Sequence, residues 1–220
     1  MISHHIHSAL ARERLDTLLA RAQNARQARQ ARSVPGGGQA VLHDGSRVLI
    51  RQVRSADAPL LADGFGRLSA RSRWMRFMMA KPQLTAAELR YLTDVDHRDH
   101  EALGALDRSG GRGVGIARYV RDAGDPRAAE IAVTVADDWQ GRGLGTVLLV
   151  RLSDRAREEG IGRFTALAAA DNLVVARLLA RMGADVVHRE AGTLRYELDL
   201  VPAGGRDHGA ARPVPSCSQP

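Results

Sequence analysis

The sequence predicts an α+β fold with a mixed, mainly antiparallel central sheet flanked by helices. Several strand-like segments follow one another early in the chain, and strand–helix–strand units come after them. That order is typical of an α+β protein, whereas a doubly wound fold alternates strands and helices throughout. Of the 220 residues, 44% are hydrophobic and 26% are charged, so the chain can build a sizeable core.

Seven short segments rich in β-branched and aliphatic residues predict the strands of this sheet. The second and third lie on either side of a glycine-rich stretch, 107–113, which predicts a hairpin. The fourth follows closely and is a third antiparallel candidate. The predicted strands are 47–53, 101–106, 114–120, 130–136, 163–168, 186–188 and 193–200.

Four segments with helical signals separate these strands. Asp57 with Pro59 marks the start of the first. Thr85 followed by Glu88 three residues later forms a capping box, which starts the second. A glycine follows each of the last two, as is common at helix ends. The predicted helices run at about 57–68, 85–93, 143–159 and 172–182.

The two ends of the chain differ from its middle. Leucine and alanine recur at helical spacing over 8–32, before a Pro-Gly-Gly-Gly break at 35–38. Residues 201–220 are rich in Pro, Gly, Ser and Ala without periodicity, which is typical of a disordered tail. We therefore expect a basic helical N-terminal extension with a Gly-rich linker (1–40), one domain (41–200) and a tail.

Composition excludes several function classes. The formal net charge is +7, but much of it lies in the N-terminal extension, so the body does not favour nucleic acid as a partner. No apolar run approaches the roughly 20 residues of a membrane-spanning helix, and the N-terminus lacks a secretory signal. We expect no membrane contact and a cytoplasmic location. The single cysteine, Cys217, excludes an intrachain disulfide and a cysteine-based metal site.

The most informative segment, 130–146, is a strand that enters a glycine-rich turn and continues into a helix. Around Gly141, Gly143 and Gly145 side chains are nearly absent, so backbone N–H groups can converge on an anion at the helix N-terminus. The helix dipole favours negative charge there, and Arg142 would add a cation. A diphosphate is therefore the natural ligand of this turn.

Two familiar nucleotide motifs do not fit the turn. A P-loop requires Gly-Lys-Ser/Thr, and this turn has no lysine. The dinucleotide fingerprint is G-x-G-x-x-G in a parallel βαβ unit, whereas this turn is G-x-G-x-G after a strand of an antiparallel run. The same glycine spacing recurs at 111–115 between two strands, where we interpret it as a hairpin, so glycine spacing alone is a weak signal.

At this turn the sequence resembles the GNAT superfamily of acyl-CoA-dependent N-acyltransferases. Their cofactor motif, Gln/Arg-x-x-Gly-x-Gly/Ala, is matched by Gln140, Gly143 and Gly145. A second motif, an asparagine followed by a helix that ends in glycine, is matched by the segment that begins at Asn172. The resemblance covers about 45–200 and implies a GNAT-like fold that uses acetyl-CoA as co-substrate without a metal.

The resemblance also implies which residues bind acetyl-CoA. Backbone groups of the strand would contact the pantetheine amides, and the turn would hold the diphosphate. Ordinary core packing for the strand valines, and helix capping for the asparagine, are equally good explanations. The implied cofactor-binding residues are Ala132, Val133, Thr134, Val135, Gln140, Gly141, Arg142, Gly143, Leu144, Gly145, Thr146 and Asn172.

Three further segments look like the catalytic domain of bacterial protein lysine acetyltransferases, which act on targets such as acyl-CoA synthetases. These segments are 68–77, 91–96 and 129–133. The resemblance implies transfer of acetyl to a lysine amine of a protein. The sequence departs from the superfamily at Leu179, where many members have a general-acid tyrosine.

A lysine acceptor requires a base, because its pKa near 10.4 leaves only about one amine in a thousand uncharged at neutral pH. We expect Glu130 to be this catalytic base. It lies ten residues before Gln140, so a pantetheine arm that follows the strand would bring its thioester nearby. We expect its apolar neighbours to raise its pKa by desolvation. In the resembling enzymes the glutamate at this motif position is the base; the ordinary alternative is a water-facing carboxylate.

Two other groups of residues have competing interpretations. We expect the apolar residues within 74–79 to be core at a helix end, and a lining of the acceptor groove is the alternative. His97 and His100, beside three aspartates, suggest a metal site, but we favour a solvated loop because they lie between a helix and a strand.

Three functions remain open on the sequence. The first is an acetyl-CoA-dependent protein lysine N-acetyltransferase. The second acetylates a small amine such as a polyamine or antibiotic, and would be favoured by an acidic acceptor pocket. The third is a non-catalytic acyl-CoA sensor whose basic arm binds nucleic acid or another partner. The N-terminal helix is expected either to cover the active site or to mediate a homodimer.

Overall fold

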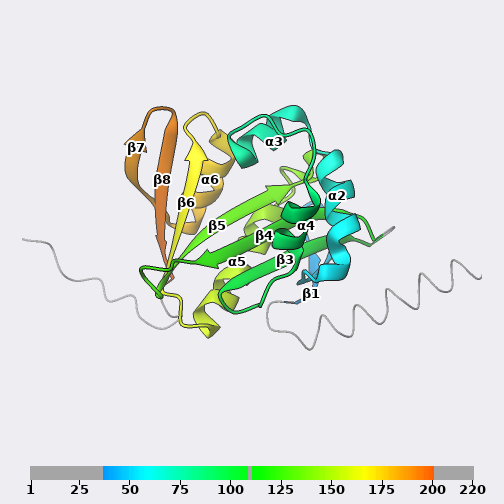
Figure 1. The fold of residues 1–220 in the computed structure, drawn as a ribbon, viewed down its shortest axis with the longest axis horizontal. Coiled ribbons are helices and arrows are strands. Elements are labelled where there is room, and N and C mark those ends of the chain that lie inside the picture. Colours follow the sequence, from blue (N-terminus) through cyan, green and yellow to red (C-terminus); the bar gives the residue numbers. More distant parts are fainter. Residues whose placement is uncertain (1–36, 109–110, 201–220) are drawn as a thin grey trace, which may run out of the picture.

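The computed structural model describes residues 37–108 and 111–200. Their centre is an eight-stranded sheet in the order β1-β2-β3-β4-β5-β6-β8-β7 (Figure 1). The strands are β1 (Gly38–Val41), β2 (Arg47–Gln52), β3 (His100–Asp107), β4 (Gly113–Arg121), β5 (Ala128–Val135), β6 (Arg163–Ala169), β7 (Asp185–Glu190) and β8 (Thr193–Asp199). The helices are η1 (Ser55–Asp57), α2 (Ala58–Gly66), α3 (Ala70–Phe77), α4 (Ala86–Thr93), η2 (Asp137–Trp139), α5 (Leu144–Glu158) and α6 (Leu173–Met182).

Strand pairing confirms the mixed, mainly antiparallel sheet. Strands β5 and β6 are parallel, and all other neighbours pair antiparallel. The predicted hairpin joins β3 to β4. The expectation that β5 belongs to an antiparallel run holds for its β4 edge, whereas β5, α5 and β6 form a parallel βαβ unit. Strand β1 was not predicted, and it begins at Gly38, inside the segment assigned to the linker.

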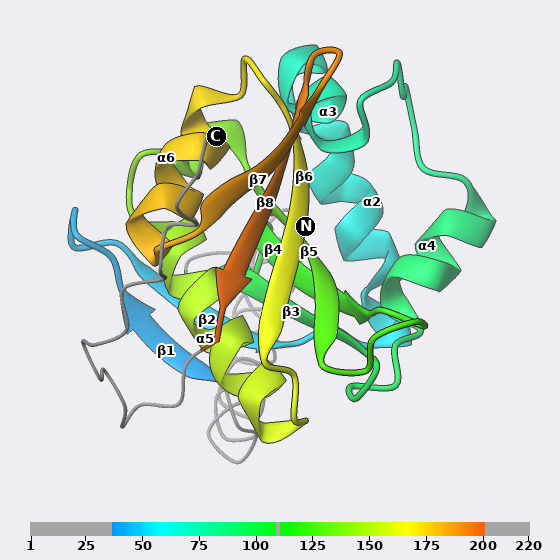
Figure 2. The same cartoon turned by 90° about the vertical axis from the view of Figure 1, so that its left-hand side faces the viewer.

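The helices cover both faces of the sheet. Helices α2, α3 and α4 lie on one side, and α5 and α6 lie on the other (Figure 2). Helix α5 presents buried side chains at helical spacing to the sheet, because apolar residues three, four and eight positions apart share one face. These residues include Leu144, Leu148, Leu152 and Ala156.

Side-chain capping explains where α4 begins, but not where α2 begins. Thr85 Oγ1 accepts the N–H of Glu88 (3.2 Å) and Glu88 accepts the N–H of Thr85 (2.9 Å), which confirms the capping box of α4. Asp57 precedes α2 as predicted, but its carboxylate does not cap that helix. It instead forms a two-bond ion pair with Arg51 (2.6 and 2.7 Å) and accepts the N–H of Arg54 (2.8 Å).

The core lies mainly between the sheet and α5. Tyr119 and Phe164 pack their rings 6.0 Å apart within it, and the Tyr119 hydroxyl donates to the carbonyl oxygen of Arg98 (3.0 Å). The expectation that the apolar residues within 74–79 are core was wrong. Helix α3 has no buried residue, and Trp74 is 43% exposed.

Some expectations fall outside the described residues. The N-terminal helix, most of the linker and the tail with Cys217 are among them. Over 37–108 and 111–200, none of the helices combines the length and apolar character needed to cross a membrane.

Candidate active site

Strands β5 and β6 pair at one end only. Their register runs from Ala128 opposite Arg163 to Glu130 opposite Thr165, and beyond this point the strands diverge (Figure 1). Glu130 is therefore the last residue of β5 that pairs with β6. The rest of β5 borders an opening in the sheet, with Glu130 at its closed end and the glycine turn at its open end.

The backbone of β5 offers hydrogen-bonding groups to this opening. The N–H of Ala136 donates to the carbonyl oxygen of Val114 (2.9 Å), next to β4. Because backbone groups alternate between the two edges of a strand, the even-numbered residues of β5 bond to β4. The C=O of Ile131, the N–H and C=O of Val133 and the N–H of Val135 then face the edge from which β6 has departed. Their spacing suits an extended ligand with amides of its own.

Two glycines give the turn its shape. Gly141 has φ = 74° and Gly143 has φ = 87°, and side chains are strained in this left-handed region. Gly143 is the N-cap of α5, and a Cβ atom there would lie 3.0 Å from Cδ2 of His43. The first helical hydrogen bond runs from Val147 N–H to Gly143 O (3.1 Å). The N–H groups of the three residues between them point out of the helix end, which is a favourable place for phosphate.

Gly145 and Asn172 shape the contact between α5 and α6 and the start of α6. A Cβ atom at Gly145 would lie 3.2 Å from Cδ2 of Leu178, so the glycine lets α6 approach the first turn of α5. Asn172 is the N-cap of α6, and its Oδ1 accepts the N–H of Val175 (3.2 Å). Helix capping is therefore one role of Asn172, and cofactor binding stays a prediction.

The turn is fastened to α3 by a network that the sequence did not reveal. Asp137 accepts the backbone N–H of Ser69 (2.8 Å) and the hydroxyls of Ser69 and Ser72. Burial would raise the pKa of Asp137, but the hydrogen bonds from Ser72 and Ser69 outweigh it and hold the pKa below its usual range. Gln140 donates from Nε2 to the carbonyl oxygen of Val135 (3.1 Å) and so closes the turn onto the end of β5.

Arg142 links the turn to the hairpin of β1 and β2. Its guanidinium donates to the hydroxyl of Ser46 (3.2 Å), lies 3.3 Å from the carboxylate of Asp44, and stacks over the ring of Trp139 at 4.9 Å. The cation expected to supplement a diphosphate site is thus paired with a carboxylate in this structure. His43, in the same hairpin, lies against Gly143.

Glu130 is exposed on the face of the sheet that carries α2, α3 and α4. The prediction that its sequence neighbours would desolvate it was wrong. Ala129 and Ile131 are buried, but successive side chains of a strand point to opposite faces, so they pack on the other side. The negative charge of Glu130 instead acts on Arg76, whose pKa is lowered by burial and raised in part by Glu130.

The two histidines near β3 bind protein groups. His97 Nδ1 lies 2.8 Å from a carboxylate oxygen of Glu101, and His100 Nε2 lies 3.1 Å from Nη1 of Arg118. Burial, and then the charge of Arg118, lower the pKa of His100. In the part of the chain that the structure describes, no group of three or more His, Cys, Asp or Glu side chains is arranged to hold a metal.

The Acetyltransferase (GNAT) domain family matches residues 47–185. The chain belongs to the GNAT acetyltransferase family. This GNAT protein is 33% identical to Acetyltransferase Pat of Mycolicibacterium smegmatis over 153 residues, 70% of the chain but 46% of Pat. It is 36% identical to an acetyltransferase of Pseudomonas aeruginosa over 144 residues, 64% of the chain and 77% of that protein.

Solved GNAT structures agree with the fold. The GNAT domain of S. lividans PAT superposes with a TM-score of 0.71 at 31% identity, covering 74% of this chain and 97% of that domain. The structure of yncA from Salmonella typhimurium with acetyl-CoA superposes with a TM-score of 0.56 at 21% identity, covering 74% of this chain and 99% of yncA. The chain thus spans less than half of the Mycolicibacterium protein and nearly all of the isolated S. lividans domain.

Proposed function

We propose that this GNAT protein transfers the acetyl group of acetyl-CoA to the lysine amine of a protein, with Glu130 as general base. The observation that carries the proposal is the position of Glu130 at the closed end of the opening between β5 and β6. The same edge of β5 leads from Glu130 to the glycine turn. The lysine acceptor is supported by the resemblance of 68–77, 91–96 and 129–133 to bacterial protein lysine acetyltransferases.

The residues present fit acetyl-CoA. The N–H groups at the start of α5 and the bare Gly143 suit a diphosphate, since a side chain at that position would collide with His43. The free edge of β5 suits the amides of a pantetheine arm. When bound, acetyl-CoA supplies an activated acetyl thioester, and residues 140–146 and 132–135 hold it in place.

Glu130 would act on the acceptor. It lies on the sheet face that carries α2 to α4, whereas α5 and α6 cover the other face, so an acceptor reaches Glu130 from the α2–α4 side (Figure 2). Its carboxylate takes a proton from the ammonium group, directly or through water, which converts the amine into a nucleophile. The amine nitrogen would then bond to the acetyl carbon as the C–S bond breaks and coenzyme A leaves as its thiolate. An N–H of the β5 edge, such as that of Val133, would donate to the oxygen of the reacting carbonyl.

The charges near Glu130 bear on the alternative of a small-amine acceptor. The charged side chains that line the neighbouring cavity are Arg51, Asp57, Arg76 and Arg118, and the only carboxylate among these four is paired with Arg51. A polyamine or a polycationic antibiotic would be repelled by this set. The described surroundings of Glu130 therefore favour an acceptor that is not strongly cationic.

The test replaces the proposed base. We expect Glu130→Gln to lower kcat by about 10²- to 10⁴-fold, because the amide cannot accept the proton. Acetyl-CoA affinity, measured by calorimetry, should stay within a few-fold because residue 130 is not expected to bind the diphosphate. The matched control is Glu190→Gln, an exposed glutamate on the edge strand β7, which should keep full turnover.

The acceptor is identified with labelled acetyl-CoA and a cell lysate. Mass spectrometry that finds acetyl-lysine in proteins with the wild type, and not with Glu130→Gln, supports the proposal. Label confined to small molecules would favour the second function, and acetyl-CoA binding without any product would favour the sensor. Turnover that is unchanged in Glu130→Gln would remove Glu130 from the role of base.

A further inference from the structure

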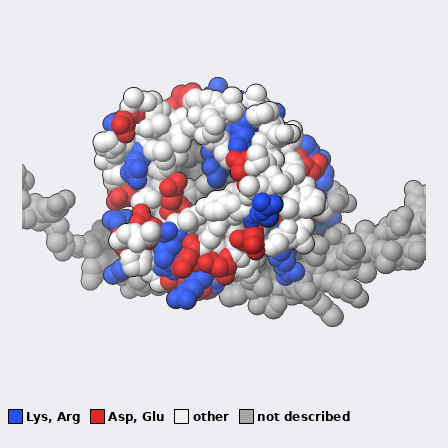
Figure 3. Space-filling model, in the orientation of Figure 1, with Lys and Arg blue, Asp and Glu red and all other residues white. Residues whose placement is uncertain are grey.

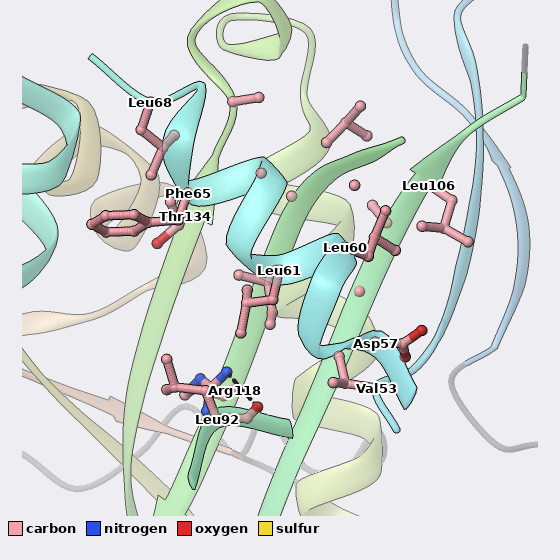
Figure 4. Close-up of a pocket in the computed structure, with 18 of the residues that line it drawn as sticks. Val53, Asp57, Leu60, Leu61, Phe65, Leu68, Leu92, Leu106, Arg118 and Thr134 are labelled. Carbon is pink, nitrogen blue, oxygen red and sulfur yellow. Dashed lines mark hydrogen bonds between the residues drawn. The ribbon is translucent and has the colours of Figure 1, made fainter. Parts of the chain in front are cut away.

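A cavity of about 110 Å³ lies between α2 and the sheet, on the side of Glu130 (Figure 4). Most of its wall is apolar, and includes Leu60, Leu61, Phe65, Leu106 and Ile116. Thr134 of β5 also lines it, so the cavity borders the strand along which acetyl-CoA is proposed to lie.

Two arginines from different elements line this cavity. Arg118 comes from β4 and is 6% exposed, and Arg76 comes from α3. Arg118 donates to the carbonyl oxygen of Leu92 (3.0 Å) and contacts His100 (3.1 Å), which are both neutral partners when His100 is unprotonated. Arg76 stacks on the ring of Phe77 at 4.9 Å.

No carboxylate of the described residues is in direct contact with either of these two cations, although the charge of Glu130 acts on Arg76 from beyond 4 Å. Among residues 37–108 and 111–200, neither Arg76 nor Arg118 has an acidic oxygen within 4 Å, whereas the buried Arg155 and the half-buried Arg51 and Arg121 each do. Burial lowers the pKa of Arg118 to about 10, and the charge of Arg76 acts in the same direction. Buried cations are normally paired, because an unpaired charge loses its hydration without compensation. This pair is thus suited to an anion that arrives with a ligand.

The strand register places the pair beside the proposed base. Arg118 lies opposite Ala132, and Val120 lies opposite Glu130. Arg118 and Glu130 are therefore diagonal neighbours on one face, with Cα atoms roughly 7–8 Å apart. Figure 3 shows a hollow on this face, over the central strands, with basic atoms inside it.

We propose that Arg76 and Arg118 bind a carboxylate of the acceptor, namely an Asp or Glu side chain two positions from the lysine that is acetylated. This deepens the proposed function and rests on it. The amine would lie at Glu130 and the acidic side chain at the arginines, and residues two positions apart in an extended peptide share one face at roughly this separation. Both groups lie on the α2–α4 face, from which an acceptor arrives, whereas the acyl donor is proposed to follow the strand edge.

The experiment uses three peptides that differ only in the residue two positions from a single lysine, which is Glu, Gln or Arg. For the wild type with acetyl-CoA, we expect kcat/KM to be about tenfold higher for the Glu peptide than for the Gln peptide, mainly through KM. Arg76→Gln should bring this ratio close to one. Arg76→Glu should reverse the order and favour the Arg peptide. The ratio isolates recognition, since any effect of Arg76 on Glu130 changes all three rates together.

Arg71→Gln is the matched control. Arg71 lies on the same helix, but five residues earlier and thus about 140° around its axis. It should keep the wild-type ratio. Equal kcat/KM for the three peptides, or a ratio unchanged by Arg76→Gln, would overturn the proposal.

Two further measurements separate this proposal from the proposed function. Binding of the same peptides, followed by fluorescence anisotropy, should show the same order as kcat/KM. Charge-dependent binding without acetyl transfer would overturn the proposed function and keep the anion site, whereas equal binding would overturn the site. A preference for succinyl-CoA over acetyl-CoA that Arg76→Gln abolishes would put the carboxylate on the donor and overturn the assignment to the acceptor.

Discussion

Replacement of Glu101 by glutamine tests the buried polar network that joins β3 to α5. Glu101 is fully buried at the start of β3. Its carboxylate accepts hydrogen bonds from Gln52 Nε2 (2.9 Å) and Arg155 Nε (3.1 Å), and it lies 2.8 Å from Nδ1 of His97. The substitution keeps the size of the side chain, but it removes the charge and turns one acceptor oxygen into a donor.

The ion pairs of Arg155 determine how much free energy of unfolding the substitution should remove. Removal of one partner from a buried ion pair costs about 3–5 kcal/mol, because the other charge is left without compensation. Arg155 also pairs with Glu158 and Glu159, so its charge stays partly balanced in the variant. We therefore expect Glu101→Gln to lower the free energy of unfolding by about 3 kcal/mol, the lower end of that range.

Urea unfolding followed by circular dichroism measures this change. The matched control is Glu158→Gln, which removes another carboxylate from the same arginine at a side chain that is 46% exposed. It should cost less than about 1 kcal/mol, since exposed ion pairs contribute little. A loss below about 1 kcal/mol for Glu101→Gln, or a loss equal to that of Glu158→Gln, would refute the reasoning.

The same network predicts a dependence on pH. Burial raises the pKa of Glu101, but the hydrogen bonds from His97, Gln52 and Arg155 outweigh it and leave the pKa below its usual range. The unfolded chain then binds a proton more readily than the folded one, so this contribution is present above a pH of about 4.3 and is lost as the pH falls through the folded pKa. The difference in stability between wild type and Glu101→Gln should shrink over that acidic range, and a constant difference would contradict the pKa assignment.

Two further substitutions test positions near the glycine turn. In Gly115→Ala the new Cβ would lie 3.1 Å from the side chains of both Leu144 and Leu148, so we expect urea unfolding to show a loss of about 1–3 kcal/mol. Gly66→Ala, which has open space around it, is the control and should show no loss. Asn172→Ala should cost about 1 kcal/mol through the lost helix cap. Calorimetry of the same variant tests whether Asn172 also contacts the cofactor. Weaker acetyl-CoA binding would support this contact, and unchanged affinity would contradict it.

Features that depend on a few consecutive residues were predictable from the sequence. The capping box at Thr85 and Glu88 formed as expected, because its two hydrogen bonds join residues three positions apart. The glycine turn between β5 and α5 formed for the same reason, since Gly141 and Gly143 adopt conformations that other residues avoid. The predicted strands and helices are likewise present, because hydrophobic periodicity decides which face of each element can be buried.

Features that depend on register and packing were not predictable. The opening beside β5 exists because β6 pairs with β5 only as far as Thr165. The sequence of neither strand indicates where this pairing ends. Asp137 binds Ser69 across 68 positions of sequence. Arg76 and Arg118 are also far apart in the sequence, and the fold brings them to one cavity from a helix and a strand.

The sequence by itself determined the local devices: helix caps, a glycine turn suited to phosphate, and the strand that carries Glu130. The tertiary structure alone decided what surrounds that carboxylate. Ala129, Ile131 and Ala132 suggested an apolar setting for Glu130, but alternation along β5 sends Ala129 and Ile131 to the opposite face and leaves only the small Ala132 on the same one. Residues from α3 and β4 supply positive charge instead, because contacts across a sheet are set by strand register and not by distance along the chain.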